Sequence, residues 1–362
     1  MGLSVEIAVN GTVDGDLAQA SRIEVTESMG GTTTYRLVYS VDIAGGDLPL
    51  LADDRLGPGS ELTISVPVNN RSECLVKGPV HAQHIHLRHG GEGSELEVLG
   101  ADTSIAMDRE TKSAVWAEVS DSDVVQSILG SYGYSPDVQA TAATHTEAKH
   151  TLVQRDSDLR FVRRLARRNG YLFWLTCDSR GVETAHFKRP SLDGSPAAEL
   201  TINRDSPTLQ TLDLSWDVER PTSVVGQQLD LNSKENLDGA VAESPLAALG
   251  QQSLAQIAGG PRSVHLQAPA DDAGDLQARG EGALIEAGWF VRASTQTSLR
   301  ALGQVVRSHT LINLTGAGSR HSGTYWVASV HHQIDAVAHY MTVELLRNGW
   351  NSSSGSPLGS LI

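Results

Sequence analysis

Residues 150–175, HTLVQRDSDLRFVRRLARRNGYLFWL, carry the signals of a helix followed by a strand. Asp156 or Ser157 can cap the helix, and Asn169 with Gly170 forms a typical C-terminal stop. The residues that we expect in the buried stripe are Leu159, Val162, Leu165 and Ala166, with Phe161 at its flank. The strand that follows predicts a hairpin with its turn at 178–181.

Five arginines lie on one side of this predicted helix, at i, i+3, i+4, i+7 and i+8. They are Arg160, Arg163, Arg164, Arg167 and Arg168. They can form an ordinary solvated face. They can also form an interface for another subunit or an acidic partner chain, because arginine is enriched at interfaces. Nucleic acid is a distant third interpretation. We therefore treat the five arginines as a candidate interface with another subunit or with a partner protein.

Charge and hydropathy exclude several classes of protein. The chain has 362 residues and a formal net charge of −15. Nucleic-acid binding by the whole surface is disfavoured, because phosphate contacts need dense Lys and Arg. We expect no membrane insertion, since no stretch reaches the roughly 18 uncharged apolar residues of a spanning helix. The N-terminus lacks the pattern of a signal peptide, which predicts assembly in the bacterial cytoplasm.

The two cysteines, Cys74 and Cys177, form no CxxC motif. A disulfide between them is possible. In a cytosolic chain, however, two reduced and buried thiols are the expected state.

Strand and turn signals predict a mainly β (α+β) fold with an inserted helical part. Alternating apolar and polar residues between glycine-rich turns fill 1–108 and return in 196–348, which predicts two tube-like antiparallel β-barrels. Residues 109–195 read as a small α+β domain. Residues 233–287 read as a loop and helical insertion, with helices near 244–260 and 273–289. Residues 349–362 read as a flexible tail.

Motifs for catalysis, cofactors or metals are weak. The sequence has no GxSxG elbow, no phosphate-binding loop and no HExxH. The densest histidine cluster is His81, His84, His86 and His89. In a strand His84 and His86 share one face while His81 and His89 point to the opposite one, and two imidazoles on a face are fewer than the ligands of a zinc site. We therefore assign no catalytic, metal or cofactor residues.

The 150–175 segment resembles the late-control-D and VgrG-type hub proteins of contractile tails. From Ser157 its pattern is [ST]-D-L-x-F-[LV]-x-R-L-A-x-x-x-G-Y-x-[FYL], with Gln154 three positions before Ser157, and further stretches follow in the same order, ending at Arg347 and Asn348. The motif residues are Gln154, Ser157, Asp158, Leu159, Phe161, Val162, Arg164, Leu165, Ala166, Gly170, Tyr171 and Phe173. We take Asp158, Leu159, Phe161, Leu165, Gly170 and Tyr171 as the motif core.

The resemblance implies a structural baseplate hub of a contractile phage tail or contractile injection system. Such hubs are homotrimers with pseudo-sixfold symmetry that adapt a hexameric inner tube to a trimeric spike. The implied partners are further copies of the chain, the tube or tube-initiator protein, other baseplate proteins and a spike. Because only 14 residues follow Asn348, we expect the spike to be a separate chain. The alternatives are a cell-wall hydrolase at the tail tip and, less favoured, a receptor-binding β protein.

Overall fold

The computed structural model describes residues 5–41, 49–69, 71–89, 91–148, 151–229, 234, 236–266 and 273–352. Strands predominate over helices, as the sequence predicts. Two compact units share the chain. The first consists of Met1–Arg189, Ser298–Ser308 and Ser329–Thr342. The second consists of Pro190–Thr297, His309–Ala328 and Val343–Ile362.

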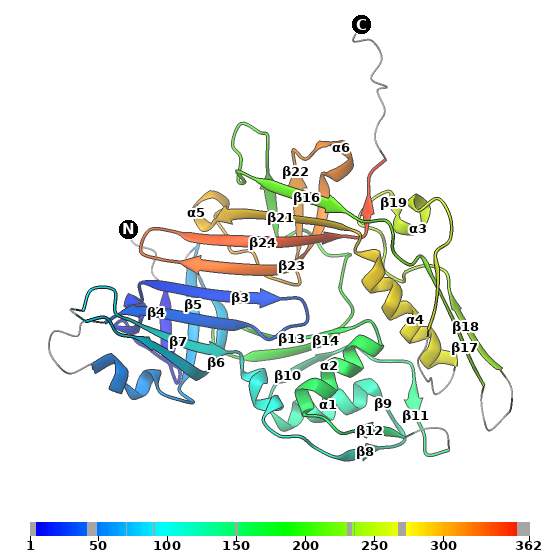
Figure 1. The fold of residues 1–362 in the computed structure, drawn as a ribbon, viewed down its shortest axis with the longest axis horizontal. Coiled ribbons are helices and arrows are strands. Elements are labelled where there is room, and N and C mark those ends of the chain that lie inside the picture. The colour runs from blue at the N-terminus through cyan, green and yellow to red at the C-terminus, as the bar shows by residue number, and fades with distance from the viewer. Residues whose placement is uncertain are drawn as a thin grey trace, which may run out of the picture. The chain divides into compact units, whose positions relative to one another are not determined.

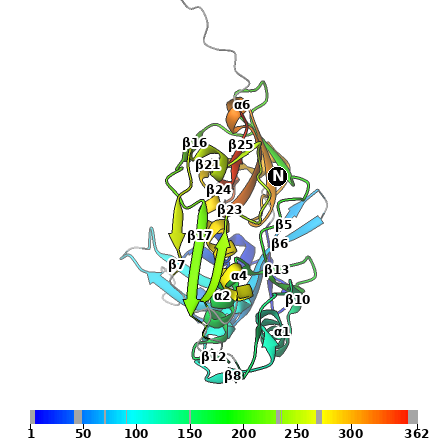
Figure 2. The same cartoon turned by 90° about the vertical axis from the view of Figure 1, so that its right-hand side faces the viewer.

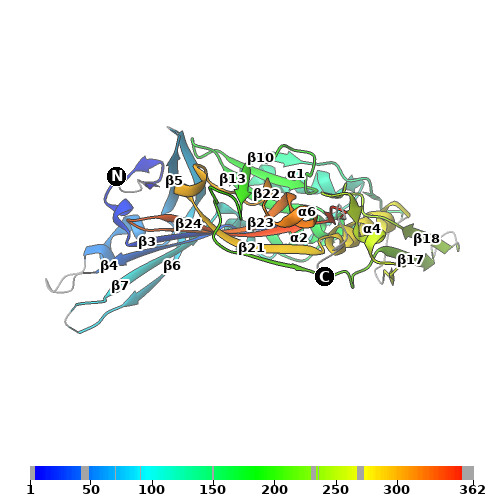
Figure 3. The ribbon, with the colours of Figure 1, turned by 90° about the horizontal axis from the view of Figure 1, so that it is seen from above.

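The first unit contains an antiparallel arrangement of strands in the order β3–β4–β7–β6–β5–β1–β2 (Figures 1 and 3). These strands are β1 (Glu6–Val9), β2 (Thr12–Val13), β3 (Arg22–Ser28), β4 (Thr34–Ser40), β5 (Glu61–Val68), β6 (Arg71–His86) and β7 (Glu95–Ala101). The second half of β23 (Gly323–Ile334) pairs with β3. Side chains of β3 alternate between half-buried and buried, as a strand with one covered face should.

Strand β6 changes partner along its length. Its residues 71–79 pair with β5, whereas residues 80–86 pair with β7. The register with β7 shifts between Val80 and Ala82, and such a bulge bends a strand. The helix α5 (Leu299–Leu302) and the first residues of β24 (His339–Arg347) also belong to this unit.

Residues 103–189 of the first unit, which we call the α/β segment, hold two helices and a three-stranded sheet (Figure 2). Its elements are η4 (Thr103–Asp108), β8 (Ala114–Trp116), β9 (Val119–Ser120), α1 (Asp121–Ser131), β10 (Ser135–Val138), β11 (Thr144–His145), β12 (Leu152–Gln154), α2 (Asp158–Arg168), β13 (Leu172–Cys177) and β14 (Glu183–Lys188). Ser157 caps α2 by accepting a hydrogen bond from the Arg160 N–H. Gly170, at φ 66°, follows the helix. Both the helix and the β13–β14 hairpin are confirmed.

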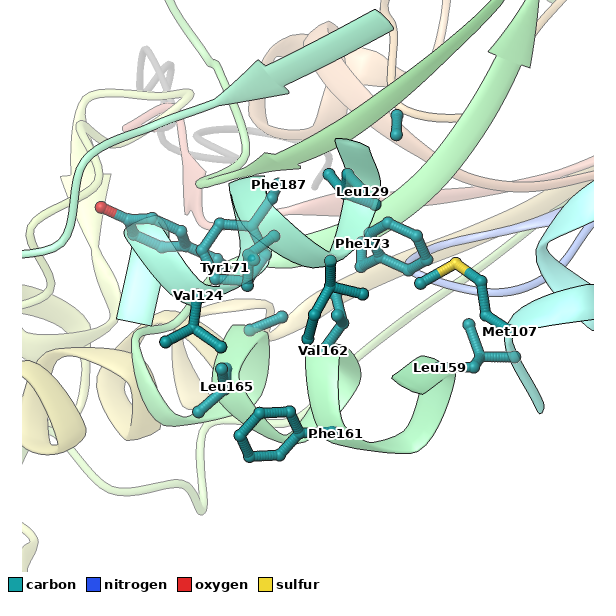
Figure 4. Close-up of a cluster of buried hydrophobic side chains, with 14 of the residues drawn as sticks. Met107, Val124, Leu129, Leu159, Phe161, Val162, Leu165, Tyr171, Phe173 and Phe187 are labelled. Carbon is teal, nitrogen blue, oxygen red and sulfur yellow. The ribbon is translucent and has the colours of Figure 1, made fainter. Parts of the chain in front are cut away.

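The hydrophobic core of the α/β segment gathers the apolar faces of both helices over β13 and β14 (Figure 4). The predicted stripe of Leu159, Val162, Leu165 and Ala166 is buried there. The placement of Phe161 at its flank was wrong, because its side chain is fully buried in the same cluster. The Arg164 guanidinium lies 5.1 Å from the centre of the Phe161 ring.

The expectation of two separate thiols is also wrong. Cys74 on β6 and Cys177 on β13 form a disulfide, with their Cα atoms 5.8 Å apart. The fold brings the two residues together across a sequence separation of 103. Sequence spacing alone does not reveal such a long-range pairing.

The second unit also combines strands with helices, and α4 packs on β17 and β18. Its strands are β15 (Ala198–Thr201), β16 (Leu212–Trp216), β17 (Ser223–Leu229), β18 (Asn236–Val241), β19 (Gln252–Ser253), β20 (Ser263–His265), β21 (Val291–Ser298), β22 (Leu311–Thr315), β25 (Gly349–Trp350) and parts of β23 and β24. Its helices are α3 (Leu254–Ile257), α4 (Ala273–Gly288) and α6 (Gly318–His321).

The helix expected at 273–289 is present as α4 despite its internal glycines. Gly280 faces β18 so closely that a Cβ there would lie 2.7 Å from a methyl carbon of Val241. The helix expected at 244–260 is only the four-residue α3, and the stretch is otherwise turns and bends.

Some predictions of organisation stay predictions. These are the three-domain division at 108 and 195 and the closure of the strands into two barrels. Most of the predicted tail lies outside the described residues, which end at Ser352.

Candidate interaction surfaces and buried polar clusters

The motif residue Asp158 has a structural role in the α/β segment. Its side chain is buried and accepts hydrogen bonds from Tyr132 Oη at 2.7 Å, from Gln154 Nε2 at 2.7 Å and from Lys112. Burial raises its pKa, but these donors outweigh burial and leave the pKa lowered. Ser157 bonds to Asp108, which fixes the start of α2 against η4. The polar positions of the motif therefore orient a helix.

The rest of the motif core also supports packing. Leu159, Phe161 and Leu165 lie in the core cluster. Tyr171 packs edge-on to Phe187 with ring centres 5.2 Å apart, and its hydroxyl donates to the Ala140 carbonyl at 2.8 Å. Gly170 ends the helix.

The structure divides the five arginines into two sets. Arg160, Arg164 and Arg167 are exposed. Arg163 and Arg168 are half-buried, with Arg163 donating to Thr32 Oγ1 at 2.6 Å and Arg168 lying 3.6 Å from Asp121. Burial lowers the pKa of Arg163. The five guanidinium groups are therefore not one surface, and the candidate interface narrows to the exposed set.

Two of the exposed arginines have acidic neighbours. Arg160 lies 3.2 Å from Asp108, and Arg164 lies 3.4 Å from Asp156. Exposed pairs of this kind contribute little to stability. The arginines therefore remain available to a partner that offers carboxylates in a better geometry.

A buried charge cluster that the sequence analysis did not single out lies in the first unit. Glu27 points inward from β3, accepts from Arg307 Nε at 2.6 Å and lies 3.2 Å from His332 Nε2. Burial opposes its charge, yet Arg307 and His332 hold its pKa at about 2. Arg307 also donates to the carbonyl oxygens of Cys74 and Leu75 on β6. The cluster thus ties β3, β6 and β23 together.

Arg347 and Asn348, where the sequence resemblance ends, are buried in the second unit and hydrogen-bond to several main-chain groups. Arg347 Nε donates to the Leu249 carbonyl at 2.8 Å, and its guanidinium lies 5.3 Å from the ring centre of Tyr325. Asn348 accepts from the Leu249 N–H at 2.8 Å and donates to the Ala247 carbonyl. This pair therefore fixes the loop that precedes β19.

The histidine cluster lies on the projecting end of β6 and the turn after it. His81, His84, His86 and His89 are all exposed. His84 faces Glu97 at 3.4 Å on the paired strand β7. No three His, Cys, Asp or Glu side chains among the described residues gather in a way that could hold a metal.

Several strands have one unpaired side in the part of the chain that the structure describes, and among them are the end of β6 in the first unit and β16 in the second. Residues 82–86 of β6 pair with β7 alone and are exposed on both faces. Ile85 on this edge is 44% exposed. In the second unit β16 pairs with β21 alone, and Trp216 on it is 52% exposed. Free edges of this kind can accept another strand.

The fold is that of tail proteins from phage and phage-related secretion machines. A tail protein from Neisseria meningitidis MC58 matches with a TM-score of 0.65 and 12% identity, over 96% of this chain and 97% of that chain. The 43 kDa tail protein of prophage MuSo2 from Shewanella oneidensis matches with a TM-score of 0.64 and 13% identity, over 95% and 98%. An E. coli type VI secretion component, described as similar to T4 tail proteins gp27 and gp5, matches with a TM-score of 0.59 and 14% identity, over 94% and 76%.

The chain belongs to the Alg8 N-terminal domain family, whose model matches residues 2–336. No curated protein matches the sequence. Within the described residues, no helix is long and apolar enough to cross a membrane.

Proposed function

We propose that the chain is a structural baseplate hub of a contractile phage tail or injection system, of the late-control-D and VgrG type. The observation that carries the proposal is the tail-protein fold along nearly the whole chain. The match covers 96% of this chain and 97% of the Neisseria tail protein, and 95% of this chain and 98% of the MuSo2 tail protein. The ordered motifs of the sequence and the buried nodes at Asp158 and Arg347 support it. The role is one of assembly, not of catalysis.

In this proposal the chain acts as a homotrimer with pseudo-sixfold symmetry. It joins the inner tube or tube initiator to a separate trimeric spike, beside other baseplate proteins, and each copy contributes two tube-like barrels. A ring of identical copies needs two different patches on each chain that meet across every contact. The open edges of β6 and β16 are two such patches. We propose that they meet between neighbouring copies.

The test is to place a charge on each edge and to measure the mass in solution. Ile85→Lys and Trp216→Lys each put a lysine where an incoming strand would pack, and both side chains are already exposed. We expect each variant to keep its far-ultraviolet circular dichroism and to lose the trimer. Ile85→Val and Trp216→Phe are the matched controls and should keep it. Trimers that persist in both lysine variants would contradict this contact.

A further inference from the structure

The Cys74–Cys177 disulfide lies at the joint between the strands of residues 5–102 and the α/β segment. Cys74 belongs to β6, and Cys177 is the last residue of β13. β6 and β13 are in contact, and both belong to the first unit (Figure 1). The bond therefore closes a loop that spans most of the α/β segment.

Much of the noncovalent contact at this joint is polar. Lys77 Nζ donates to the Gly181 carbonyl at 3.2 Å and lies 3.6 Å from Glu183. Thr103 also donates to Glu183. Arg163 of α2 donates to Thr32, which lies between β3 and β4.

Two carboxyl groups lie at this joint. Asp102 and Glu183 both line the small void beside Cys177. Burial is the main influence on each, and it raises the pKa of both groups. Their charged forms are thus disfavoured in the closed joint.

The α/β segment carries its own hydrophobic core, made of residues between Met107 and Phe187. Loss of the bond to β6 leaves that core complete. The segment can therefore loosen at the joint as a folded body, without unfolding α1 or α2.

The two cysteine residues differ in exposure. Cys74 is 2% exposed, whereas Cys177 is half-buried and precedes an exposed turn at 178–181. In the reaction that we propose, a thiolate from outside attacks the Cys177 sulfur, because Cys177 is the more exposed of the two residues. Attack there forms a mixed disulfide and releases Cys74 as a thiolate, which takes up a proton. The second thiol of a dithiol reductant then displaces Cys177, so that the dithiol is oxidised to its disulfide and both cysteines end as thiols.

We infer that the Cys74–Cys177 bond is a redox-controlled clamp that holds the α/β segment against β6. The exposed arginines of α2 belong to this segment, so the clamp also limits their movement. In the oxidised protein the joint is closed. In the reduced protein only the noncovalent contacts hold the joint, so it opens and closes reversibly. This inference rests on the first unit alone and does not depend on the hub role.

The test compares one chain in two redox states by amide hydrogen exchange, after oxidation and after treatment with dithiothreitol. We expect reduction to speed exchange by about tenfold or more in peptides covering 74–80 and 172–183, while α1 and the middle of α2 stay as protected as before. The Cys74→Ser/Cys177→Ser variant should match the reduced protein and should not respond to dithiothreitol.

Two results would overturn the clamp. One is equal exchange at the joint in both redox states of the wild-type chain, which needs no variant to fold. The other is titration of two free thiols in the denatured, oxidised protein, because the bond would then not form.

Discussion

His332 Nδ1 lies 3.1 Å from His339 Nε2 inside the first unit, and both rings are buried. The other nitrogen of His332 faces Glu27, so His332 contacts both the second histidine and the carboxylate. Burial, followed by the nearby His332, lowers the pKa of His339 to about 3. The folded protein therefore holds His339 neutral.

This lowered pKa predicts a loss of stability in acid. An unfolded histidine takes up a proton below pH of about 6.5, whereas folded His339 does not until about 3. The contribution of His339 to the free energy of unfolding is thus complete above pH of about 6.5, and it is lost as the pH falls from about 6.5 towards about 3. We expect the free energy of unfolding to fall by roughly 1 kcal/mol per pH unit below 6.5 from this group.

Urea denaturation at pH 7 and pH 5 measures the effect. His339→Gln should reduce the difference between the two pH values, and the exposed His81→Gln should not. Some dependence will remain in His339→Gln, because burial also lowers the pKa of His186 and His321. An unchanged pH dependence in His339→Gln would contradict the assignment.

Removing Glu27 should be strongly destabilising. Glu27→Ala leaves the Arg307 guanidinium without its main counter-charge in the interior, which we expect to cost about 3–5 kcal/mol. Glu24→Gln is the matched control on the same strand. Glu24 pairs with Arg22 and Arg36 near solvent, so its change should cost less than about 1 kcal/mol. Equal losses in a denaturant titration would refute a special role for the buried cluster.

Asp158→Ala should loosen the α/β segment. The change leaves Tyr132, Gln154 and Lys112 without their shared acceptor, and we expect a loss of about 2–3 kcal/mol. Asp156→Ala, which removes only the exposed-side pair with Arg164, serves as its control. Thermal unfolding of the two variants distinguishes them. The same melting temperature in both would show that Asp158 is not the organising group.

Arg160→Glu with Arg164→Glu should leave the fold intact and prevent particle assembly. Both side chains are exposed, so reversal of their charge alters few internal contacts. Assembly is scored by electron microscopy of particles, with the exposed Arg155→Glu as control. Normal particles from the double variant would show that this face of α2 is an ordinary solvated surface and not an interface.

Local signals in the sequence predicted local structure well. The cap at Ser157, the stripe from Leu159 to Ala166 and the stop at Gly170 define α2 correctly, because each acts within one helix. Phe161 was misplaced, since helical spacing shows where a side chain points but not what covers it. The five arginines divided for the same reason.

Long-range relationships were not predictable. Glu27 sits in an ordinary alternating strand, and nothing local announces that Arg307 meets it 280 residues later. The single available signal was a charged residue at an inward position of β3. The Cys74–Cys177 pairing likewise depends on the packing of β6 with β13.

The mass of the purified chain in solution tests the hub most directly. Light scattering should be recorded for the chain alone and mixed with candidate spike and tube proteins. We expect a mass near three times 38.6 kDa for the chain, alone or on the spike. A mass of one chain in both settings, with no binding to either protein, would contradict it.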